Sequence, residues 1–278
     1  MCSSDLTAEL GIDVTALSGS GPGGRIVERD VRAAADRVEV APAISGPTGE
    51  PPPEPLSRIR QVIAARLTES VTTIPQFSVT VPVDVTALVA LRAELRRAGS
   101  PVTVTDLVAH AVAQSLVELP LVNARTDGRL LWRRERVHLG IAVAIPGGLV
   151  VPVIRDADRR SPAALHEDAT RLIADARAGT LPPDARSGST FTISNLGMMG
   201  VESFTAIVNP GESAILAVGS IGPEVVALGE GMAVRQRMRI TLSADHRLVD
   251  GELGARFINA VRRRLEDEAG WRRILTEG

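Results

Sequence analysis

The chain of 278 residues is long enough for one domain of ordinary size and a smaller piece, and its hydrophobic content of 44% supports a buried core. A formal net charge of −2 gives no general attraction to nucleic acid or to an anionic membrane. The single cysteine, Cys2, excludes a disulfide framework within the chain and fits a reducing compartment, and the absence of lysine excludes Schiff-base chemistry.

Three regions follow one another along the chain. Residues 5–35 contain a short apolar pattern and the glycine-rich stretch "SGSGPGGRI", which predict a small helical domain. Residues 36–55 are rich in Pro, Gly and Ala, which predicts an extended linker. Residues 56–278 have globular patterning throughout. The stretch "GSGPGG" (19–24) formally matches a dinucleotide-binding fingerprint, but a proline-rich linker follows where the second strand should be, so we expect only a tight loop.

Within the large region, apolar residues at helical spacing predict helices over 58–71, 84–99, 103–119, 161–179 and 251–266. Alternating or continuous apolar runs predict strands over 76–85, 190–193, 213–218 and 237–243. The most apolar stretch, 138–154, is interrupted by Pro146, Gly147, Gly148 and Pro152, so we expect two buried strands around a turn and not a membrane span. Interleaved strands and helices predict an α/β sandwich of two layers with a mixed sheet. No signal peptide is evident, and we expect a cytoplasmic protein without a membrane partner.

Histidine is the residue type that best separates structural from functional candidates in this sequence. His110 lies in an apolar helix, His138 enters a strand, and His166 lies in a charged helix, so structural roles are expected for all three. His246, in "LSADHRLVDG", lies at a strand-to-helix junction, where side chains are exposed for function. The sequence does not predict a metal site, because no second histidine stands at metal-ligand spacing. It does not predict a serine triad either, because there is no G-x-S-x-G motif.

Two further polar residues have ordinary structural interpretations when each is taken alone. Asp250 can cap the final helix, which stabilises a helix by about 1 kcal/mol. Ser194, in "FTISNLG", can simply close a strand in a turn.

Taken together, the motifs "DHRLVDG", "FTISNLG" and "GGLVVPVIRDAD" resemble the catalytic domain of dihydrolipoamide acyltransferases, the core components of 2-oxoacid dehydrogenase complexes. The resemblance covers essentially all of 56–278 and implies a chloramphenicol-acetyltransferase-like fold. Residues 5–35 similarly resemble part of the peripheral-subunit-binding domain of that family. The family passes an acyl group between the thiols of dihydrolipoamide and coenzyme A. It uses a near-neutral base on the thiol and a donor to the tetrahedral oxyanion.

By this resemblance His246 is the base, Ser194 the oxyanion donor, and Asp250 an organiser of the site. An ion pair of Asp250 with an arginine of the first helix of the large region is expected, with Arg66 as first candidate and Arg60 as second. Arg25 and Arg29 are the expected contacts to an acidic partner surface. The family also implies a homotrimer with active sites between subunits, assembled into a cubic 24-mer or a dodecahedral 60-mer.

The implied partners are a 2-oxoacid decarboxylase, dihydrolipoamide dehydrogenase and a lipoyl domain. Because lysine is absent, the lipoyl group must be carried on another domain or chain. We expect the small domain to be truncated, and hypothesise that "MCSSDL" is not native; reading the upstream gene sequence tests this. The motifs do not identify the transferred acyl group; acetyl or branched-chain groups are favoured over succinyl. The alternatives are a free-standing enzyme of the chloramphenicol-acetyltransferase type and a structural core protein without turnover.

Overall fold

The computed structural model describes residues 19–24, 26–28, 30 and 53–277. The chain divides into two units, Met1–Pro55 and Leu56–Gly278. In the first unit, the glycine-rich stretch forms a short 3-10 turn, η2 (Pro22–Gly24), in which Gly23 has a φ of 73°. The Asp30 carboxylate accepts hydrogen bonds from the Ser20 amide and hydroxyl. Arg25 and Arg29, predicted to bind a partner, lie outside the described residues.

The second unit is built on a seven-stranded mixed sheet, in the order β1-β11-β9-β8-β4-β7 with β10 paired to β11. Strands β8 and β9, and β4 and β8, run parallel, whereas the other pairs are antiparallel. Their bounds are β1 Gln76–Asp84, β4 Leu139–Ile141, β7 Val153–Ile154, β8 Phe191–Asn195, β9 Ala214–Val218, β10 Gly222–Leu228 and β11 Gly231–Asp245. The predicted α/β class with a mixed sheet is therefore confirmed.

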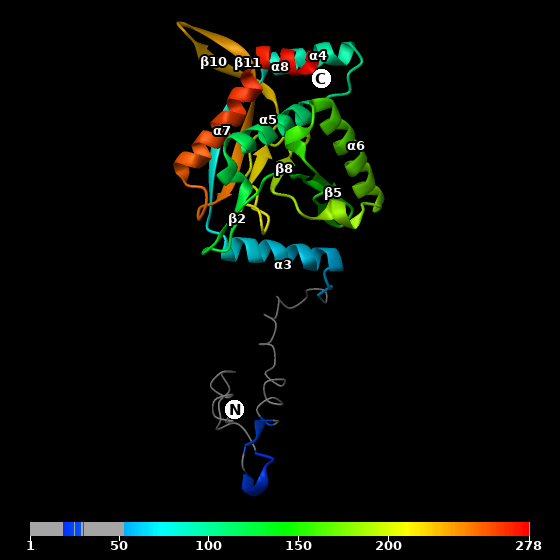
Figure 1. The fold of residues 1–278 in the computed structure, drawn as a ribbon, viewed down its shortest axis with the longest axis vertical. Helices are drawn as coiled ribbons and strands as arrows, with labels where there is room; N and C mark the ends of the chain where they lie inside the picture. The colour runs from blue at the N-terminus through cyan, green and yellow to red at the C-terminus, as the bar shows by residue number, and fades with distance from the viewer. Residues whose placement is uncertain (1–18, 25, 29, 31–52, 278) are drawn as a thin grey trace. The chain divides into compact units, whose positions relative to one another are not determined.

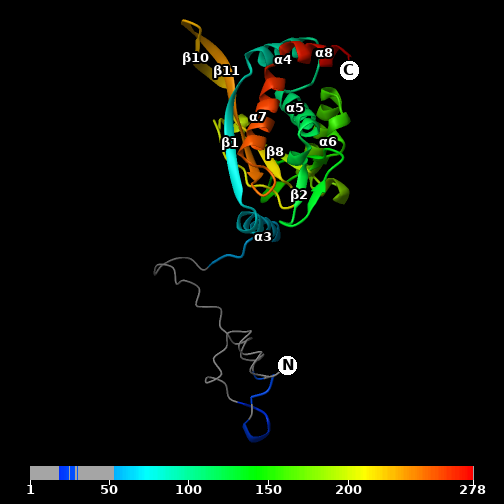
Figure 2. The same ribbon diagram turned by 60° about the vertical axis from the view of Figure 1, so that its left-hand side comes forward.

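Two small hairpins accompany the sheet: β2 (Ala124–Thr126) pairs with β3 (Leu131–Arg133), and β5 (Val143–Ile145) pairs with β6 (Gly148–Val150). The helices are α3 Arg58–Thr73, α4 Thr86–Arg97, α5 Val104–Glu118, α6 Pro162–Ala178, α7 Gly251–Glu266 and α8 Glu268–Glu277. In Figures 1 and 2, α5 and α7 lie against one side of the sheet, and α3 lies at the end of the domain away from α4 and α8.

The helices predicted over 103–119, 161–179 and 251–266 are present as α5, α6 and α7, and local signals explain where two of them begin. Thr103 and Asp106 form a reciprocal capping box at the start of α5. Helix α6 begins with Ser161 as N-cap and Pro162 in its first turn, and it ends at Gly179 in the left-handed conformation. Helix α7 buries Phe257, Val261 and Leu265 of the predicted stripe.

The expectation of two strands over 138–154 is wrong in detail, since this stretch forms four short strands in two sheets. Gly147, with a φ of 84°, closes the β5–β6 hairpin. Pro152 has no N–H to donate and separates β6 from β7, although its carbonyl still accepts from the Ile141 amide. The final strand is also longer than predicted, because β11 continues outward to pair with β10, and α8 was not predicted at all.

The core lies between the sheet and the helices α5 and α7. The rings of Phe191 on β8 and Phe257 on α7 lie 5.6 Å apart, and both side chains are fully buried. This contact identifies the face of β8 that meets the helices. No helix in the described part of the chain is long and apolar enough to cross a bilayer.

Candidate active site

His246 lies in a turn that directly follows β11. The carbonyl of Asp245 accepts from the amides of Leu248 and Val249 at 3.0 and 2.9 Å, which folds the turn back on itself. The amide of His246 donates to the carbonyl of Pro75 at 2.9 Å, so the turn is also tied to the segment between α3 and β1. The position of the histidine is therefore fixed on both sides by backbone hydrogen bonds.

Asp245, which had no assignable role in the sequence, anchors this turn. Its buried carboxylate accepts two hydrogen bonds from the Arg247 guanidinium, Nε to Oδ1 at 2.9 Å and Nη2 to Oδ2 at 2.7 Å. The backbone amide of Arg247 also donates to Oδ1, at 3.0 Å. The Asp245 carboxylate raises the pKa of the Arg247 guanidinium through these hydrogen bonds. The two residues flanking His246 are thus locked together, which fixes the backbone on both sides of the imidazole.

The imidazole of His246 is exposed in the single subunit and rests edge-on against Phe77, with ring centroids 4.6 Å apart. Phe77 pairs with Ala244 across β1 and β11. A Cβ added at Gly254 of α7 would meet Phe77 at 3.1 Å, so the ring lies on the side of the sheet that α7 covers. His246 therefore stands at the end of the sheet on its helix-covered side.

Asp250 forms the N-cap of α7, and its carboxylate accepts from the Leu253 amide at 2.8 Å. The helix-capping role expected for Asp250 is confirmed. The expected ion pair is not formed among the described residues of this chain: neither Arg66 nor Arg60 pairs with Asp250. Arg60 lies in the first turn of α3, where its amide bonds the Ser57 hydroxyl, and Arg66 borders a cavity described below.

Ser194 lies on β8, paired with Ala217, which in turn pairs with Thr241. Because side chains alternate along a strand, Ser194 and Thr192 point away from the face on which Phe191 and Ile193 meet the helices. Ser194 is half-buried, and no hydrogen bond of its hydroxyl is formed among the described residues. The serine is therefore available to donate.

Strand register separates His246 from Ser194 within one chain. Thr241 is level with Ser194, and His246 follows five positions later, just past the end of β11 at Asp245. At about 3.3 Å per residue and about 4.8 Å between strands, the two side chains lie roughly 16 Å apart along the strands and roughly 10 Å across them. They also lie on opposite faces, so a single chain does not bring them together.

A residue that the sequence reasoning missed is Glu212, only 4% exposed and two positions before the start of β9. Its Oε1 accepts from Ser189 at 2.5 Å, from Thr192 at 2.9 Å and from the Asn209 amide group at 3.5 Å. Burial is the largest cause that raises the pKa of Glu212, to about 7, while these hydrogen bonds and the nearby charge of Arg66 act against it. No sequence motif pointed to Glu212, because the hydroxyl groups that bond it belong to residues far away in the sequence.

Glu212 and Arg66 border the same cavity, of about 430 Å³. One wall is α3, through Ile59, Val62, Ile63 and Leu67, and the other includes Leu149–Val151 and residues 186–189. Gly148 permits the close approach of these walls, because a Cβ there would meet Ile63 at 2.8 Å.

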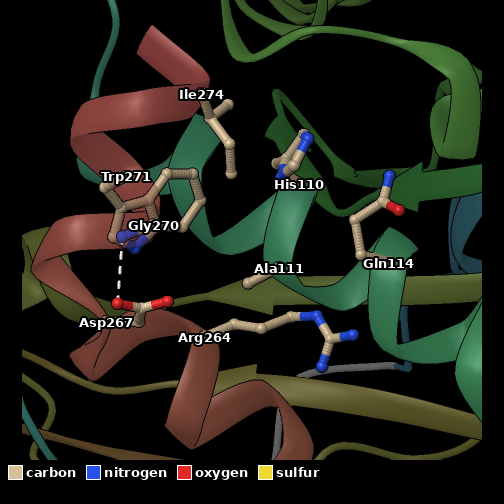
Figure 3. A pocket seen from close by; sticks show the side chains of 8 residues that line it. All are labelled: His110, Ala111, Gln114, Arg264, Asp267, Gly270, Trp271 and Ile274. Atoms are coloured by element: carbon tan, nitrogen blue, oxygen red, sulfur yellow. Dashed lines mark hydrogen bonds between the residues drawn. The ribbon is translucent and has the colours of Figure 1, made fainter.

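The other histidines have structural surroundings. His166 contacts the Asp106 carboxylate at 2.8 Å and links α6 to α5. His138 accepts from the Asp156 amide, and burial lowers its pKa. His110 lies 5.6 Å from the Trp271 ring beside a small cavity of about 80 Å³ between α5 and the end of the chain, which Figure 3 shows. Burial also lowers the pKa of His110. The described residues contain no group of three or more His, Cys, Asp or Glu side chains arranged to hold a metal ion.

Comparison with protein families gives two matches that together span most of the chain. Residues 49–271 match the catalytic domain of the 2-oxoacid dehydrogenases acyltransferase family, and residues 5–32 match the e3 binding domain. The dihydrolipoyllysine-residue acetyltransferase component of the pyruvate dehydrogenase complex from Rhizobium meliloti is 37% identical over 95% of this chain and 66% of the relative. The chain thus spans just under two thirds of that relative's length.

Two solved structures are similar to the large unit. One is the dihydrolipoamide acetyltransferase of Azotobacter vinelandii, with 36% identity, a TM-score of 0.78, and coverage of 85% of this chain and 98% of that one. Its structural and enzymatic study concerns the catalytic roles of a serine, a histidine 52 positions later, and an asparagine four positions after the histidine. The other, with the same identity, TM-score and coverage, is the cubic core of a pyruvate dehydrogenase multienzyme complex.

Proposed function

This chain belongs to the 2-oxoacid dehydrogenase acyltransferase family, and from that premise we propose that it transfers an acyl group between dihydrolipoamide and coenzyme A. The observation that carries the proposal is the spacing of its polar site residues. Ser194, His246 and Asp250 stand 52 and four positions apart, as do the serine, histidine and asparagine of the Azotobacter vinelandii enzyme. Asp250 is the one departure in residue type.

In this proposal His246 is the general base. Attack of a thiol on a thioester needs the thiolate, and an imidazole with a pKa near neutrality removes the thiol proton without a metal ion or a covalent intermediate. The proton then passes from the imidazole to the departing thiolate. The Asp245–Arg247 ion pair supports this role, since it fixes the turn on both sides of the histidine.

Ser194 supplies the hydroxyl that donates to the oxyanion of the tetrahedral intermediate. Removal of one such donor typically raises the barrier by about 2.7–4 kcal/mol. Because His246 and Ser194 are far apart in one chain, the proposed site combines His246 of one subunit with Ser194 of its neighbour. This arrangement needs an oligomer, and a trimer within a multienzyme core is the proposed assembly.

Acetyl is the proposed acyl group. The relatives from Rhizobium meliloti and Azotobacter vinelandii are both acetyltransferases. Comparing acetyl, isobutyryl, isovaleryl and succinyl dihydrolipoamide as donors tests the specificity, and a higher kcat/KM for any other donor would contradict it. A lipoyl group on another domain or chain and a dihydrolipoamide dehydrogenase bound through residues 5–35 complete the proposal. A cytoplasmic location is part of the proposal.

The decisive experiment is His246→Ala, assayed for acyl transfer to coenzyme A from free acetyl-dihydrolipoamide. We expect turnover to be abolished while light scattering gives the assembly size of the wild-type chain. His166→Ala is the matched control, because that histidine packs between α5 and α6 and should leave turnover intact. Unchanged turnover in His246→Ala would refute the assignment of the base.

A further inference from the structure

The proposed oxyanion donor, Ser194, is held in place by its backbone alone. Its hydroxyl makes no hydrogen bond among the residues that the structure describes, and β8 ends one residue later, at Asn195. Ser194 pairs with Ala217 of β9 on one side, whereas on the other side the pairing with β4 stops at Ile193. The position of the hydroxyl therefore depends on the contacts that fix the end of this strand.

The side chain of Asn195 makes two hydrogen bonds at the end of β8. Its Nδ2 donates to the Thr105 hydroxyl at 3.1 Å, and its Oδ1 accepts from the Gly197 amide at 2.8 Å. The first bond joins β8 to α5, which lies 90 positions earlier in the sequence, and the second closes the turn that follows the strand. One amide group thus connects the strand end to two separate parts of the fold.

The α5 end of this connection is rigid. Thr105 lies in the first turn of α5, between the two members of the capping box, Thr103 and Asp106. The Asp106 carboxylate is 5% exposed and also contacts the His166 ring of α6, at 2.8 Å. Because the capping box and this contact fix the first turn of α5, Thr105 is a firm anchor for Asn195.

The turn after β8 is also closely packed. A Cβ added at Gly197 would meet the Gly219 carbonyl oxygen at 2.7 Å, so only glycine lets the turn lie against the end of β9. The Leu196 amide donates to the Val218 carbonyl at 3.1 Å in the same place. The hydrogen bond from Gly197 to Asn195 keeps this turn attached to the strand that carries Ser194.

Asn195 itself lies on the side of the sheet away from the proposed chemistry. Successive side chains of a strand point to opposite faces, and the bond of Asn195 to α5 places it on the helix-covered face. Ser194 points to the other face. An effect of Asn195 on turnover must therefore pass through the backbone that the two residues share.

From this geometry we propose that Asn195 is a positioning residue for the oxyanion donor. Its amide holds the backbone of Ser194 between α5 and the Gly197 turn, so that the hydroxyl is already in place when the tetrahedral intermediate forms. Donors that are fixed in advance stabilise a developing charge most effectively, and a displacement of about 1 Å can lower a rate about 100-fold. This inference rests on the proposed function.

The test is steady-state acyl transfer from acetyl-dihydrolipoamide to coenzyme A by the full chain. Asn195→Ala removes both hydrogen bonds and should lower kcat at least about tenfold, while KM for either substrate stays within about twofold. Thr105→Val removes only the bond to α5 and should lower kcat about two- to tenfold. Asn195→Asp should restore most of the activity, because its carboxylate accepts from the Gly197 amide and from the Thr105 hydroxyl.

A double-mutant cycle shows whether Asn195 acts through Ser194. Loss of one oxyanion donor typically lowers kcat about 10²–10³-fold. Once Ser194→Ala has removed the hydroxyl, adding Asn195→Ala should lower kcat no further, whereas a general loss of packing would lower it by the same factor in both backgrounds. Asn259→Ala is the matched control, because that side chain bonds only the Ala255 carbonyl of its own helix and its removal should leave kcat unchanged.

Wild-type kcat in Asn195→Ala would overturn the inference, as would an equal loss with and without the Ser194 hydroxyl. If light scattering shows that Asn195→Ala does not assemble, the milder Thr105→Val takes its place in the same cycle, with the same two contradicting results. If the wild-type chain transfers acyl groups in those cases, the proposed function stands and only the role of Asn195 is wrong. A wild-type chain without acyl transfer would refute both proposals.

Discussion

Asp245 and Arg247 form a two-point ion pair that encloses His246 between them, with N–O distances of 2.9 and 2.7 Å. The aspartate is 3% exposed, so this pair is screened less by solvent than an ordinary surface pair. Its geometry makes the turn rigid at both neighbours of the proposed base. The pair therefore gives Asp245 a positioning role.

Asp245→Asn should lower kcat for acyl transfer without a matching rise in KM, because the amide keeps only one of the two oxygens that accept from the guanidinium and the support of the turn around His246 weakens. The loss of charge-assisted hydrogen bonds should also lower the free energy of unfolding by about 1.5–3 kcal/mol. Steady-state kinetics and urea denaturation measure the two effects. Arg247→Ala should give the same phenotype, and the double variant should lose less than the sum of the singles. Fully additive losses would show that the pair does not act as a unit.

Mixed assembly tests the placement of His246 and Ser194 on different chains. His246→Ala and Ser194→Ala chains, denatured together in equal amounts and refolded, should regain activity that neither has alone. With random mixing, about one quarter of the sites would receive an intact histidine from one chain and an intact serine from its neighbour. The measurement is acyl-transfer rate against that of wild-type chain treated in the same way. A mixture no more active than the two variants assayed separately would place both residues in one chain.

Asp250 has a structural role and a proposed role in the site, and two substitutions separate them. Asp250→Ser keeps an N-cap oxygen for the Leu253 amide, so the stability of α7 should be unchanged. Asp250→Ala removes the cap and should lower the free energy of unfolding by about 1 kcal/mol. If Asp250 also organises the site, both variants lose activity although only the alanine loses stability. Full activity in Asp250→Ser would show that the only role of Asp250 is to cap α7.

Much of the fold could be predicted because its signals are local. The capping box at Thr103 and the Ser161–Gly179 boundaries of α6 depend on residues a few positions apart, and both helices lie within the ranges predicted for them. The β10–β11 hairpin was missed because its apolar side chains remain exposed; Val225 and Val234, for example, are 64% and 65% exposed. Its strands are held by ladder hydrogen bonds and not by burial, so the hydrophobic pattern gave no useful guide.

The residues of the candidate site likewise include some that could be predicted from the sequence and some that could not. His246 was predicted from its position between a strand and a helix. The role of Asp245 was not, although its partner Arg247 is two positions away, because aspartate and arginine so close together on a turn ordinarily point into solvent. Glu212 could not be found from sequence, since Ser189 and Thr192 reach it only after β8 and β9 pair.

Glu212 should make the stability of this protein fall as the pH rises from mildly acidic to neutral. Its pKa is raised from 4.5 to about 7 in the folded chain, chiefly by burial. Between these values the folded state holds a proton that the unfolded state has released, so the free energy of unfolding decreases with pH across this window and levels off above about 7. The groups that face the carboxyl are Ser189, Thr192, Asn209 and the guanidinium of Arg66, and only the last is charged.

Glu212→Gln removes this ionisation while its side-chain oxygen still accepts from the same three donors. The variant should therefore show a flatter profile of unfolding free energy between pH 4.5 and about 7, measured by urea denaturation at a series of pH values. The difference between variant and wild type should grow toward neutral pH and reach on the order of 3 kcal/mol at most. Glu202→Gln is the control for the removal of a carboxylate elsewhere, because that glutamate is exposed and pairs with Arg239 on the surface at 2.9 Å. Parallel profiles for wild type and Glu212→Gln would mean that the carboxyl ionises in the folded protein as it does in the unfolded chain.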